Sequence, residues 1–464
     1  MTREASSVLT VAQAPVAFHV MSKPTGAVCN LDCEYCFFLS KEQLYPDGSF
    51  RMSPEVHEAY VRQLLEGHRD QVEVVVAFQG GEPTMMGLDF FRRTVELERQ
   101  YAQPGQTILN ALQTNATLLD DEWGAFLAEH GFLVGVSIDG PAELHDAYRV
   151  DKGGKPTFER VMRGLDVLRR HDVDWNALCT VNAANQDHGR DVYVFLRDEC
   201  GATFVQFIPI VERATAETLP LLDAGRQLRP AQRPLYRQDG AQVTHRSVDP
   251  AAYGQFLVDV FEEWIRRDVG TVFVQDFDTA LGHWMGLDQG GVCVHAKTCG
   301  TQLALEHNGD VYSCDHFVEP DYLLGNITAG TTLLQLVASP EQRRFGQDKH
   351  DSLPGYCQNC DVRFACNGGC PKDRFTTTPD GEPGLHYLCA GYQRFFRHID
   401  EPMRTMADLL RHHRPAAQAM QAVGQADLRR PATAPAPAAV ATSGSTATAS
   451  PHLEAAEQSA GPRR

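Results

Sequence analysis

The sequence predicts an α/β fold in which a partial (β/α)6 TIM-like barrel is followed by a smaller cysteine-rich domain. Between residues 15 and 270, six short apolar runs rich in β-branched residues alternate with six amphipathic stretches of helical period, the pattern of parallel βα units. Polar motifs follow the first four runs, and both a barrel and an open doubly wound sheet gather such loops at the carboxyl ends of their strands. We favour the barrel because its mouth collects the loops of every strand.

The predicted strands are short and bounded by turn residues. They span residues 17–21, 72–78, 107–112, 132–138, 174–181 and 204–210. The predicted helices lie near residues 54–66, 88–102, 120–130, 157–171, 187–199 and 251–267. Ser53 and Pro54 mark the start of the first helix, because a serine hydroxyl caps a helix and proline suits its first turn.

Composition divides the chain into further parts. The barrel accounts for residues 15–270, after an N-terminal arm of residues 1–14. Residues 271–400 contain a linker and the cysteine-rich domain, and residues 401–414 are a predicted C-terminal helix. Residues 415–464 have no aromatic residue and no cysteine and are rich in Ala, Pro, Ser and Thr, so we expect this tail to be disordered.

Two segments show a distinct local pattern. Within residues 303–312, Asn308 and Gly309 separate two short strand-like runs, which predicts a small β-hairpin. Residues 211–250 lack clear periodicity, and we expect them to form a long loop that closes over the barrel mouth.

Composition and charge exclude several classes of protein. The 464 residues include 42 Lys and Arg against 60 Asp and Glu, and this net charge of −18 disfavours nucleic acids and anionic membranes as partners. No apolar run is long enough to cross a membrane. The first residues lack the basic, apolar and small-residue pattern of a secretory signal. We therefore expect a cytoplasmic protein with neither a nucleic-acid nor a membrane partner.

The thirteen cysteines are the main indication of chemistry. An odd number of cysteines in such a chain fits metal-bound thiols better than disulfide bonds. Cys179, in a strand-like run, and Cys200, at a helix end, are expected to be buried apolar residues. The other eleven form two sets, three near the N-terminus and eight between residues 293 and 389.

The first set follows the first predicted strand with the spacing Cys-x3-Cys-x2-Cys. Cys29, Cys33 and Cys36 can bind three irons of a [4Fe–4S] cluster and leave the fourth iron without a protein ligand. An open coordination position is typical of catalytic metal sites. The alternative is a zinc knuckle that takes its fourth ligand from a remote residue.

This spacing, with Tyr35 before the last cysteine, resembles the signature of the radical S-adenosylmethionine superfamily. The resemblance implies that the open iron binds the amino and carboxylate groups of S-adenosylmethionine, and that the cluster cleaves this cofactor to a 5′-deoxyadenosyl radical. After the second predicted strand, Gly80, Gly81 and Glu82 resemble the superfamily's Gly-Gly-Glu-Pro segment. Glycines let the backbone approach a ligand closely, and the carboxylate can accept a hydrogen bond from an ammonium group.

Further cofactor contacts follow from the same resemblance. Ser137 and Asp139, after the fourth predicted strand, are expected near the ribose of S-adenosylmethionine. Arg149 is expected near its methionyl carboxylate. Helix caps or surface ion pairs are the alternatives for these residues.

The second cysteine set supplies enough thiols for two fully ligated clusters, and two zinc sites would use the same number. The pattern resembles the SPASM extension of radical enzymes that modify peptides. By this resemblance, one [4Fe–4S] cluster is held by Cys293, Cys299, Cys314 and Cys370. The other is held by Cys357, Cys360, Cys366 and Cys389. Together with the first set, this implies three [4Fe–4S] clusters.

Within that group the chain resembles the anaerobic sulfatase-maturating enzymes over roughly residues 15–400. The segments that carry the resemblance are residues 29–36, 39–46, 78–83, 113–115, 137–140, 206–209, 311–315 and 364–372. The family often has glycine where this chain has Ala116, and the C-terminal tail has no counterpart that we can match.

The family oxidises a cysteine or serine of a sulfatase to Cα-formylglycine. The resemblance assigns the general base to Asp315, beside the ligand Cys314, where proton loss and electron loss can be coupled. The alternative for Asp315 is a turn residue that follows the hairpin. Gln79 is expected to orient the substrate, whereas Tyr35 and Phe37 are expected to pack around the cluster. The implied partners are a sulfatase polypeptide and an electron donor such as flavodoxin or ferredoxin, with the enzyme acting as a monomer.

Two other functions remain open from the sequence. One is a SPASM enzyme that forms thioether or carbon–carbon crosslinks in a small ribosomal peptide. The other is a non-catalytic iron–sulfur or zinc protein. The sequence does not distinguish a cysteine target from a serine target.

Overall fold

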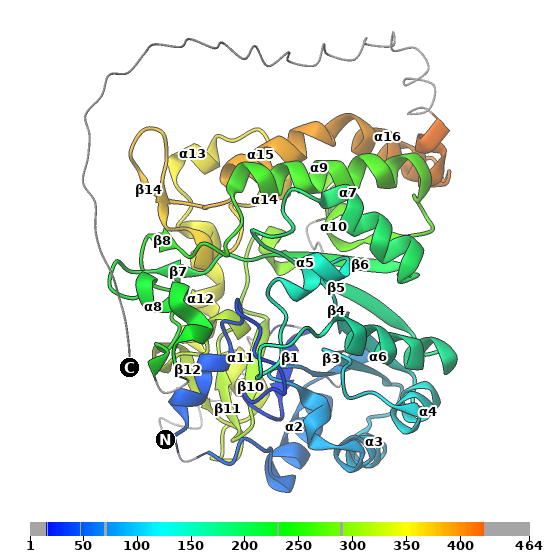
Figure 1. The fold of residues 1–464 in the computed structure, drawn as a ribbon, viewed down its shortest axis with the longest axis vertical. Coiled ribbons are helices and arrows are strands. Elements are labelled where there is room, and N and C mark those ends of the chain that lie inside the picture. Colours follow the sequence, from blue (N-terminus) through cyan, green and yellow to red (C-terminus); the bar gives the residue numbers. More distant parts are fainter. Residues whose placement is uncertain are drawn as a thin grey trace, which may run out of the picture.

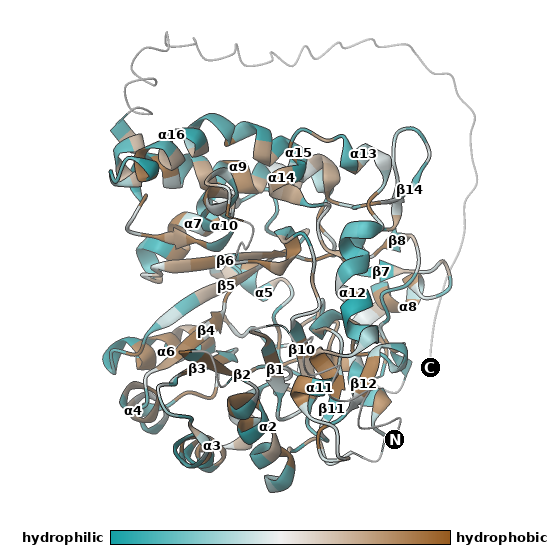
Figure 2. Cartoon of the chain, turned by 180° about the vertical axis from the view of Figure 1, so that it is seen from behind, coloured by the Kyte–Doolittle hydropathy of each residue, from teal (hydrophilic) through white to brown (hydrophobic). Residues whose placement is uncertain are grey.

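The computed structural model describes residue 15 and residues 17–46, 48–68, 72–229, 232–287 and 291–421. A ten-stranded, mostly parallel sheet crosses this part of the chain in the order β12-β11-β10-β1-β2-β3-β4-β5-β6-β9 (Figure 1). Figure 2 shows hydrophobic residues gathered in the central strands, while the surrounding helices carry both hydrophobic and hydrophilic residues. The predicted arm and most of the predicted tail lie outside the described residues.

All six predicted strands are confirmed. They are β1 (His19–Lys23), β2 (Glu73–Phe78), β3 (Thr107–Thr114), β4 (Phe132–Ser137), β5 (Trp175–Val181) and β6 (Phe204–Pro209). The helices that alternate with them are α2 (Pro54–Gly67), α3 (Leu88–Tyr101), α4 (Asp121–Glu129), α5 (Ala142–Asp146), α6 (Phe158–Arg170), α7 (Gly189–Val194) and α9 (Pro250–Arg267). As predicted, Ser53 caps α2 through a hydrogen bond from the Val56 amide, and Pro54 is its first residue.

Strands β1 to β6 pair in chain order, as in a barrel, whereas a doubly wound sheet reverses direction at a switch point. The side chains of Val74 and Val76 are buried on one face of β2, and Val75 is 36% exposed on the other. Among the described residues, β12 and β9 each pair with one strand of this sheet only, so the barrel is partial and does not close.

The hairpin predicted around Asn308 extends the same sheet. Strands β10 (Gln302–Glu306) and β11 (Asp310–Tyr312) flank the turn, and Gly309 has φ of 92°, the left-handed conformation that glycine adopts without strain. Strand β10 then pairs in parallel with β1, with His19 opposite Gln302 and Lys23 opposite Glu306. This pairing across more than 280 residues of sequence was not predicted.

The rest of the chain surrounds the hairpin and covers the far end of the sheet. Next to the hairpin are β12 (Leu323–Asn326), α11 (Leu333–Val337) and α12 (Pro340–Asp351). The helical layer contains α10 (Gln275–Trp284), α13 (Gly355–Gln358), α14 (Arg363–Cys366), α15 (Cys389–His398) and α16 (Asp400–Arg411) (Figure 1). Beyond α16, Ala416–Gln418 form a short 3-10 helix and Ala419 is buried, so ordered chain continues past the expected start of the tail at residue 415.

Residues 211–250 are more structured than the predicted long loop. They contain the two-stranded ribbon β7 (Arg213–Ala214) and β8 (Gln242–Val243), and the short helix α8 (Leu219–Ala224). Edge strand β9 (Phe273–Val274) and ribbon β13 (Thr376–Thr377) with β14 (Pro383–Leu385) complete the strands. Within the described part of the chain, no helix combines the length and apolar character needed to cross a membrane.

Helices α9 and α15 pack at a glycine contact, which gives a test of the fold. A Cβ atom at Gly254 would lie 2.5 Å from the Gly391 Cα, closer than packed atoms approach. We expect Gly254→Ala to lower the free energy of unfolding by about 1–3 kcal/mol, the usual cost of overpacking. The matched control is Gly282→Ala in α10, where the new Cβ would have only Leu287 at 3.9 Å. That variant should be stabilised by up to about 1 kcal/mol; equal thermal unfolding of both variants would contradict the close helix contact.

Candidate active site

The three cysteines of the first set lie together in the loop that follows β1. The Leu31 amide donates to Cys29 Sγ at 3.3 Å, and the Cys36 amide donates to the Cys33 carbonyl at 3.1 Å. Burial raises the pKa of Cys33 to about 12 and also raises the pKa of Cys29 and Cys36. Thiols in this setting become thiolates only when a positive group such as a metal stabilises the negative charge.

The glycine motif after β2 packs directly against this cysteine loop. The Gly81 amide donates to the Gly26 carbonyl at 2.9 Å, and the Glu82 amide donates to the Val28 carbonyl at 3.0 Å. A Cβ atom on Gly81 would lie 1.9 Å from the Val28 carbonyl oxygen, and Gly80 has φ of 124°. The two glycines therefore allow the two loops to meet, which is a structural requirement in addition to their predicted role at the cofactor.

The carboxylate of Glu82 is buried and already accepts several hydrogen bonds. One oxygen accepts from the amide and the hydroxyl of Thr84 and from the hydroxyl of Thr114 at 2.7 Å, and the other accepts from the Asn115 amide at 2.8 Å. Burial raises the pKa of Glu82, although these donors favour the ionised form. Glu82 thus ties the loops after β2 and β3 together, and its contact with an ammonium group stays a prediction.

Asp139 and Arg149 form a buried ion pair with each other. The guanidinium donates to both carboxylate oxygens, at 2.9 and 3.0 Å, and Asp139 also accepts from the Tyr35 hydroxyl and the Thr180 amide. Although burial raises the pKa of Asp139, the Arg149 charge holds it below its ordinary value. Through Tyr35 this pair holds the cysteine loop against β4 and β5, and its expected contacts with the cofactor stay predictions.

Ser137 and Gln79 lie at the ends of β4 and β2. The Ser137 hydroxyl accepts a hydrogen bond of 3.0 Å from Gln113, and the Gln79 side-chain nitrogen lies 2.7 Å from Met21 Sδ. Both side chains are partly exposed on the same face of the sheet as Val75. Strand β3 lies between these two strands, and a ligand at the carboxyl ends of the strands would lie near both side chains.

The predicted base Asp315 forms an ion pair with Lys23, a residue that the sequence analysis did not select. Lys23 is the last residue of β1, is 2% exposed and also lies 3.9 Å from the ring centre of Phe38. Burial raises the pKa of Asp315, but Lys23, His316 and Lys41 together hold the pKa below its ordinary value. A lysine at the buried end of a central strand is the signal that could have indicated this partner.

The second cysteine set divides into two groups of thiols. Burial raises the pKa of Cys314, and the nearby thiols of Cys370 and Cys293 raise it further. Burial likewise raises the pKa of Cys366 to about 12, with a further increase from three thiols, those of Cys389, Cys357 and Cys360. These four cysteines line one cavity together with Val362, Gly368 and His386. The two expected buried cysteines, Cys179 and Cys200, are fully buried.

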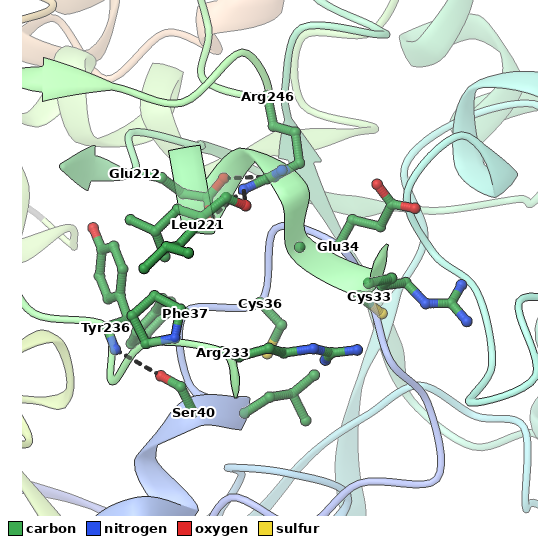
Figure 3. A pocket seen from close by; sticks show the side chains of 15 residues that line it. Cys33, Glu34, Cys36, Phe37, Ser40, Glu212, Leu221, Arg233, Tyr236 and Arg246 are labelled. Atoms are coloured by element: carbon green, nitrogen blue, oxygen red, sulfur yellow. Dashed lines mark hydrogen bonds and ion pairs between the residues drawn. The ribbon is translucent and has the colours of Figure 1, made fainter. Parts of the chain in front are cut away.

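Residues 211–250 lie over the cysteine loop, as predicted for a segment that covers the mouth. Asp32 of the loop accepts from Arg233 at 2.7 and 2.9 Å and from Arg226 at 3.1 Å. Figure 3 shows the pocket between the two segments, with Cys33 and Cys36 on one side and the Arg246–Glu212 ion pair on the other. Cys33 and Cys36 thus line a pocket that also contains charged residues of the covering segment.

Two family models match the chain. The model of the Radical SAM superfamily matches residues 24–195, and the model of an iron-sulfur cluster-binding domain named SPASM matches residues 293–361. A serine-type anaerobic sulfatase-maturating enzyme of Bacteroides thetaiotaomicron is 45% identical over 412 residues, which cover 89% of this chain and 96% of that relative. The chain belongs to the family of anaerobic sulfatase-maturating enzymes.

Further relatives and solved structures support this family membership. A cysteine-type anaerobic sulfatase-maturating enzyme of Clostridium perfringens is 32% identical, with 82% of this chain and 95% of that relative covered. The solved structure of native anSMEcpe with bound AdoMet and Cp18Cys peptide is 30% identical, with a TM-score of 0.72 and coverage of 84% of this chain and 99% of that chain. Streptococcus suis SuiB bound to precursor peptide SuiA has a TM-score of 0.53 at 13% identity, which shows a shared fold alone.

The cofactors of this family member are [4Fe–4S] clusters and S-adenosylmethionine, and the zinc alternatives are not supported. The donor set fits clusters, because cysteine thiolates are their usual ligands and burial raises the pKa of a thiol in each group, namely Cys33, Cys314 and Cys366. Eleven cysteines correspond to one set of three and two sets of four, which matches three clusters with one open iron.

The Asp139–Arg149 ion pair gives a test of the site's stability. We expect Asp139→Asn to lower the free energy of unfolding by about 3–5 kcal/mol at neutral pH, because Arg149 would be left buried without its partner. Since the pKa of Asp139 is lowered in the folded protein, its stabilising effect is full above the ordinary pKa of aspartate and is lost as the pH falls through the lowered value. The difference between wild type and variant should therefore shrink in acid.

The matched control for this measurement is Asp166→Asn. Asp166 pairs with Arg169 on the surface and is 57% exposed, so its loss should cost less than about 1 kcal/mol. Denaturant unfolding of both variants at neutral and acidic pH measures the two effects. A cost for Asp139→Asn as small as that of the control would show that the buried pair does not hold the loop.

Proposed function

We propose that the chain oxidises a cysteine or serine side chain of a sulfatase polypeptide to Cα-formylglycine. Family membership supports this function, since relatives of both the serine type and the cysteine type match over most of the chain. The observation within the molecule that supports the proposal is the Lys23–Asp315 ion pair, because Lys23 ends the strand β1 that leads into the loop of the first three cysteines.

The reaction removes two hydrogens from the substrate in different forms. Bound to Cys29, Cys33 and Cys36, a [4Fe–4S] cluster with S-adenosylmethionine supplies the radical chemistry that takes a hydrogen atom from the substrate Cβ. The substrate must then lose one electron and the proton of its thiol or hydroxyl. The products are a thioaldehyde from cysteine, which water converts to the aldehyde, or the aldehyde directly from serine.

Asp315 is the proposed acceptor of that proton. Its carboxylate is ionised beside Lys23, and a base must be unprotonated before the reaction. Lys23 and the Phe38 ring fix the orientation of the carboxylate, since the lysine is buried and contacts both groups. Gln79, at the end of β2, is proposed to orient the substrate backbone.

The cofactor contacts belong to the same proposal. Cys293, Cys299, Cys314 and Cys370 are proposed to hold one auxiliary cluster, and Cys357, Cys360, Cys366 and Cys389 the other. S-adenosylmethionine is proposed to contact Gly80, Gly81, Glu82, Ser137, Asp139 and Arg149. The proximity of thiols within each set supports the first assignment.

The partners and the setting complete the proposal. The electron needed to start the reaction comes from an external donor, for which a flavodoxin or ferredoxin is suited by its low potential. We also propose that the enzyme acts as a cytoplasmic monomer. A reducing compartment suits its thirteen cysteines, none of which forms a disulfide bond in the described part of the chain.

The function is tested with two synthetic peptides that contain Cys-x-Pro-x-Arg or Ser-x-Pro-x-Arg. Anaerobically purified enzyme, S-adenosylmethionine and a reductant should convert at least one peptide to the aldehyde, detected by mass spectrometry. Formation of a crosslinked peptide without aldehyde would favour the alternative SPASM chemistry. Absence of both iron and 5′-deoxyadenosine would favour a non-catalytic protein.

Replacing Cys29, Cys33 and Cys36 together by alanine should abolish cleavage of S-adenosylmethionine. The auxiliary clusters should remain, because their thiols lie in a separate part of the chain. Iron content and 5′-deoxyadenosine are measured together, with Cys179→Ala as a matched control that removes a buried thiol outside the three sets. Cleavage at the wild-type rate in the triple variant would contradict the assignment.

Asp315→Asn should uncouple radical formation from product formation. Asparagine keeps the shape of the side chain but is not a useful base, so formylglycine should fall at least about a hundredfold while 5′-deoxyadenosine still forms. Iron content must be measured in parallel because Asp315 is adjacent to Cys314. The control is Asp321→Asn, an exposed carboxylate in the same segment. A variant that retains its iron and makes normal amounts of aldehyde would show that Asp315 is not the base.

A further inference from the structure

The two auxiliary cysteine sets meet at one short loop. We call Cys293, Cys299, Cys314 and Cys370 the first auxiliary set, and Cys357, Cys360, Cys366 and Cys389 the second auxiliary set. Cys366 belongs to the second auxiliary set and Cys370 to the first, so the three residues between them join the two proposed clusters. These residues, Asn367, Gly368 and Gly369, all have positive φ, at 47°, 73° and 63°. Three consecutive left-handed residues are rare and must be held by the surrounding structure.

Arg374 holds this loop with its guanidinium group. It donates to three consecutive carbonyl oxygens, those of Asn367 at 3.1 Å, Gly368 at 2.9 Å and Gly369 at 3.2 Å. It also donates to the Lys349 carbonyl at 2.6 Å, at the end of α12. The guanidinium group thus joins the loop between the two auxiliary sets to helix α12, which packs on the first auxiliary set.

Helix α12 brings a second cation to the first auxiliary set. Lys349 is 1% exposed, and its ammonium group donates to the carbonyl oxygens of Cys293 at 2.6 Å and Val294 at 2.9 Å and to that of Ala296. On the same helix, a Cβ atom at Gly346 would lie 2.2 Å from the Cys299 carbonyl oxygen, so the helix backbone touches the ligand segment.

Neither cation is neutralised by a carboxylate. Among the described residues, no Asp or Glu forms an ion pair with the buried Lys349 or the half-buried Arg374, although most buried charges are paired. Burial lowers the pKa of Arg374, and nearby thiols of both sets oppose this effect, namely Cys357, Cys370, Cys366 and Cys299. Burial also lowers the pKa of Lys349, and three thiols of the first auxiliary set oppose this effect, namely Cys299, Cys370 and Cys293.

We propose that Arg374 is a positioning residue shared by the two auxiliary clusters, whose positive charge makes both easier to reduce, while Lys349 acts on the first cluster alone. The inference rests on the cluster ligation proposed above. A [4Fe–4S] cluster with four thiolates is negatively charged, and each one-electron reduction adds one negative charge. A fixed cation in a desolvated site stabilises the more negative state and raises the reduction potential.

This arrangement bears on the reaction because the substrate must release one electron. Two neighbouring anionic clusters disfavour the reduction of each other. A cation between them lowers this repulsion for either one, and so keeps both able to accept the electron. The backbone hydrogen bonds of Arg374 fix the position of the charge without cancelling it.

The test compares four variants of the reconstituted full-length enzyme by iron analysis and EPR-monitored redox titration. Arg374→Gln removes the charge, whereas Arg374→Lys keeps it and loses the fork of hydrogen bonds. Lys349→Gln removes the second charge. Arg404→Gln is the matched control, because Arg404 is 68% exposed and paired with Asp400 on α16.

We expect Arg374→Gln to shift the potentials of both auxiliary clusters to more negative values. The reduction equilibrium should change at least about tenfold, which is about 59 mV for one electron. Lys349→Gln should shift one auxiliary cluster only, and Arg374→Lys and Arg404→Gln should leave the potentials close to those of the wild type.

Three results would overturn the proposal. The first is an iron-replete Arg374→Gln variant with unchanged potentials. The second is an equal shift in Arg374→Lys and Arg374→Gln, because the hydrogen bonds rather than the charge would then be responsible. The third is an equal loss of auxiliary iron from both variants, because Arg374 would then be only a structural brace. A wild-type enzyme without auxiliary iron would instead contradict the ligation itself.

Discussion

The parallel pairing of β1 with β10 is the contact on which the proposed active site depends. Strand β1 ends at Lys23 and leads into the cysteine loop, while β10 leads through a tight hairpin to Cys314 and Asp315. Strand β11 returns antiparallel to β10, and the residues that follow it bring Asp315 to the Lys23 ammonium group. One continuous sheet therefore fixes the position of the Asp315 carboxylate relative to the cysteine loop. A carboxylate on a separately moving domain would not be held so closely.

Burial sets a second constraint, because a charge removed from water needs a partner. Asp139 has Arg149, Glu212 has Arg246, and Asp315 has Lys23. The eleven thiols have no such protein partners in sufficient number, and burial raises the pKa of most of them. Iron–sulfur clusters supply the positive charge that these thiolates require. The cysteines are therefore the proposed binding positions of the clusters, and the ion pairs hold the surrounding loops.

Much of the fold and the chemistry could be predicted from the sequence, because both depend on local patterns. The six strands of the barrel are β-branched runs, the turn at Gly309 needs a left-handed residue, and the spacing of Cys29, Cys33 and Cys36 restricts which metal site is possible. The motif glycines Gly80 and Gly81 could also be selected, although not their contact with the cysteine loop.

The parts that could not be predicted depend on contacts between distant segments. Strands β9 and β12 are too short for a periodic signal, and the pairing of β1 with β10 depends on packing across the whole chain. Lys23 was missed because a lysine at a strand end is commonly exposed, and only its partner Asp315 explains its burial. Residues 211–250 show no period because ion pairs to Asp32 hold them in place of an apolar face.

The central claim is that the site removes a hydrogen atom from the substrate Cβ and completes the oxidation in the same complex. A peptide with deuterium at the Cβ of its target residue tests this claim most directly. The account predicts that deuterium appears in 5′-deoxyadenosine and that one aldehyde forms for each labelled molecule of it. Unlabelled 5′-deoxyadenosine together with aldehyde formation would contradict the account, because the hydrogen would then leave by another route.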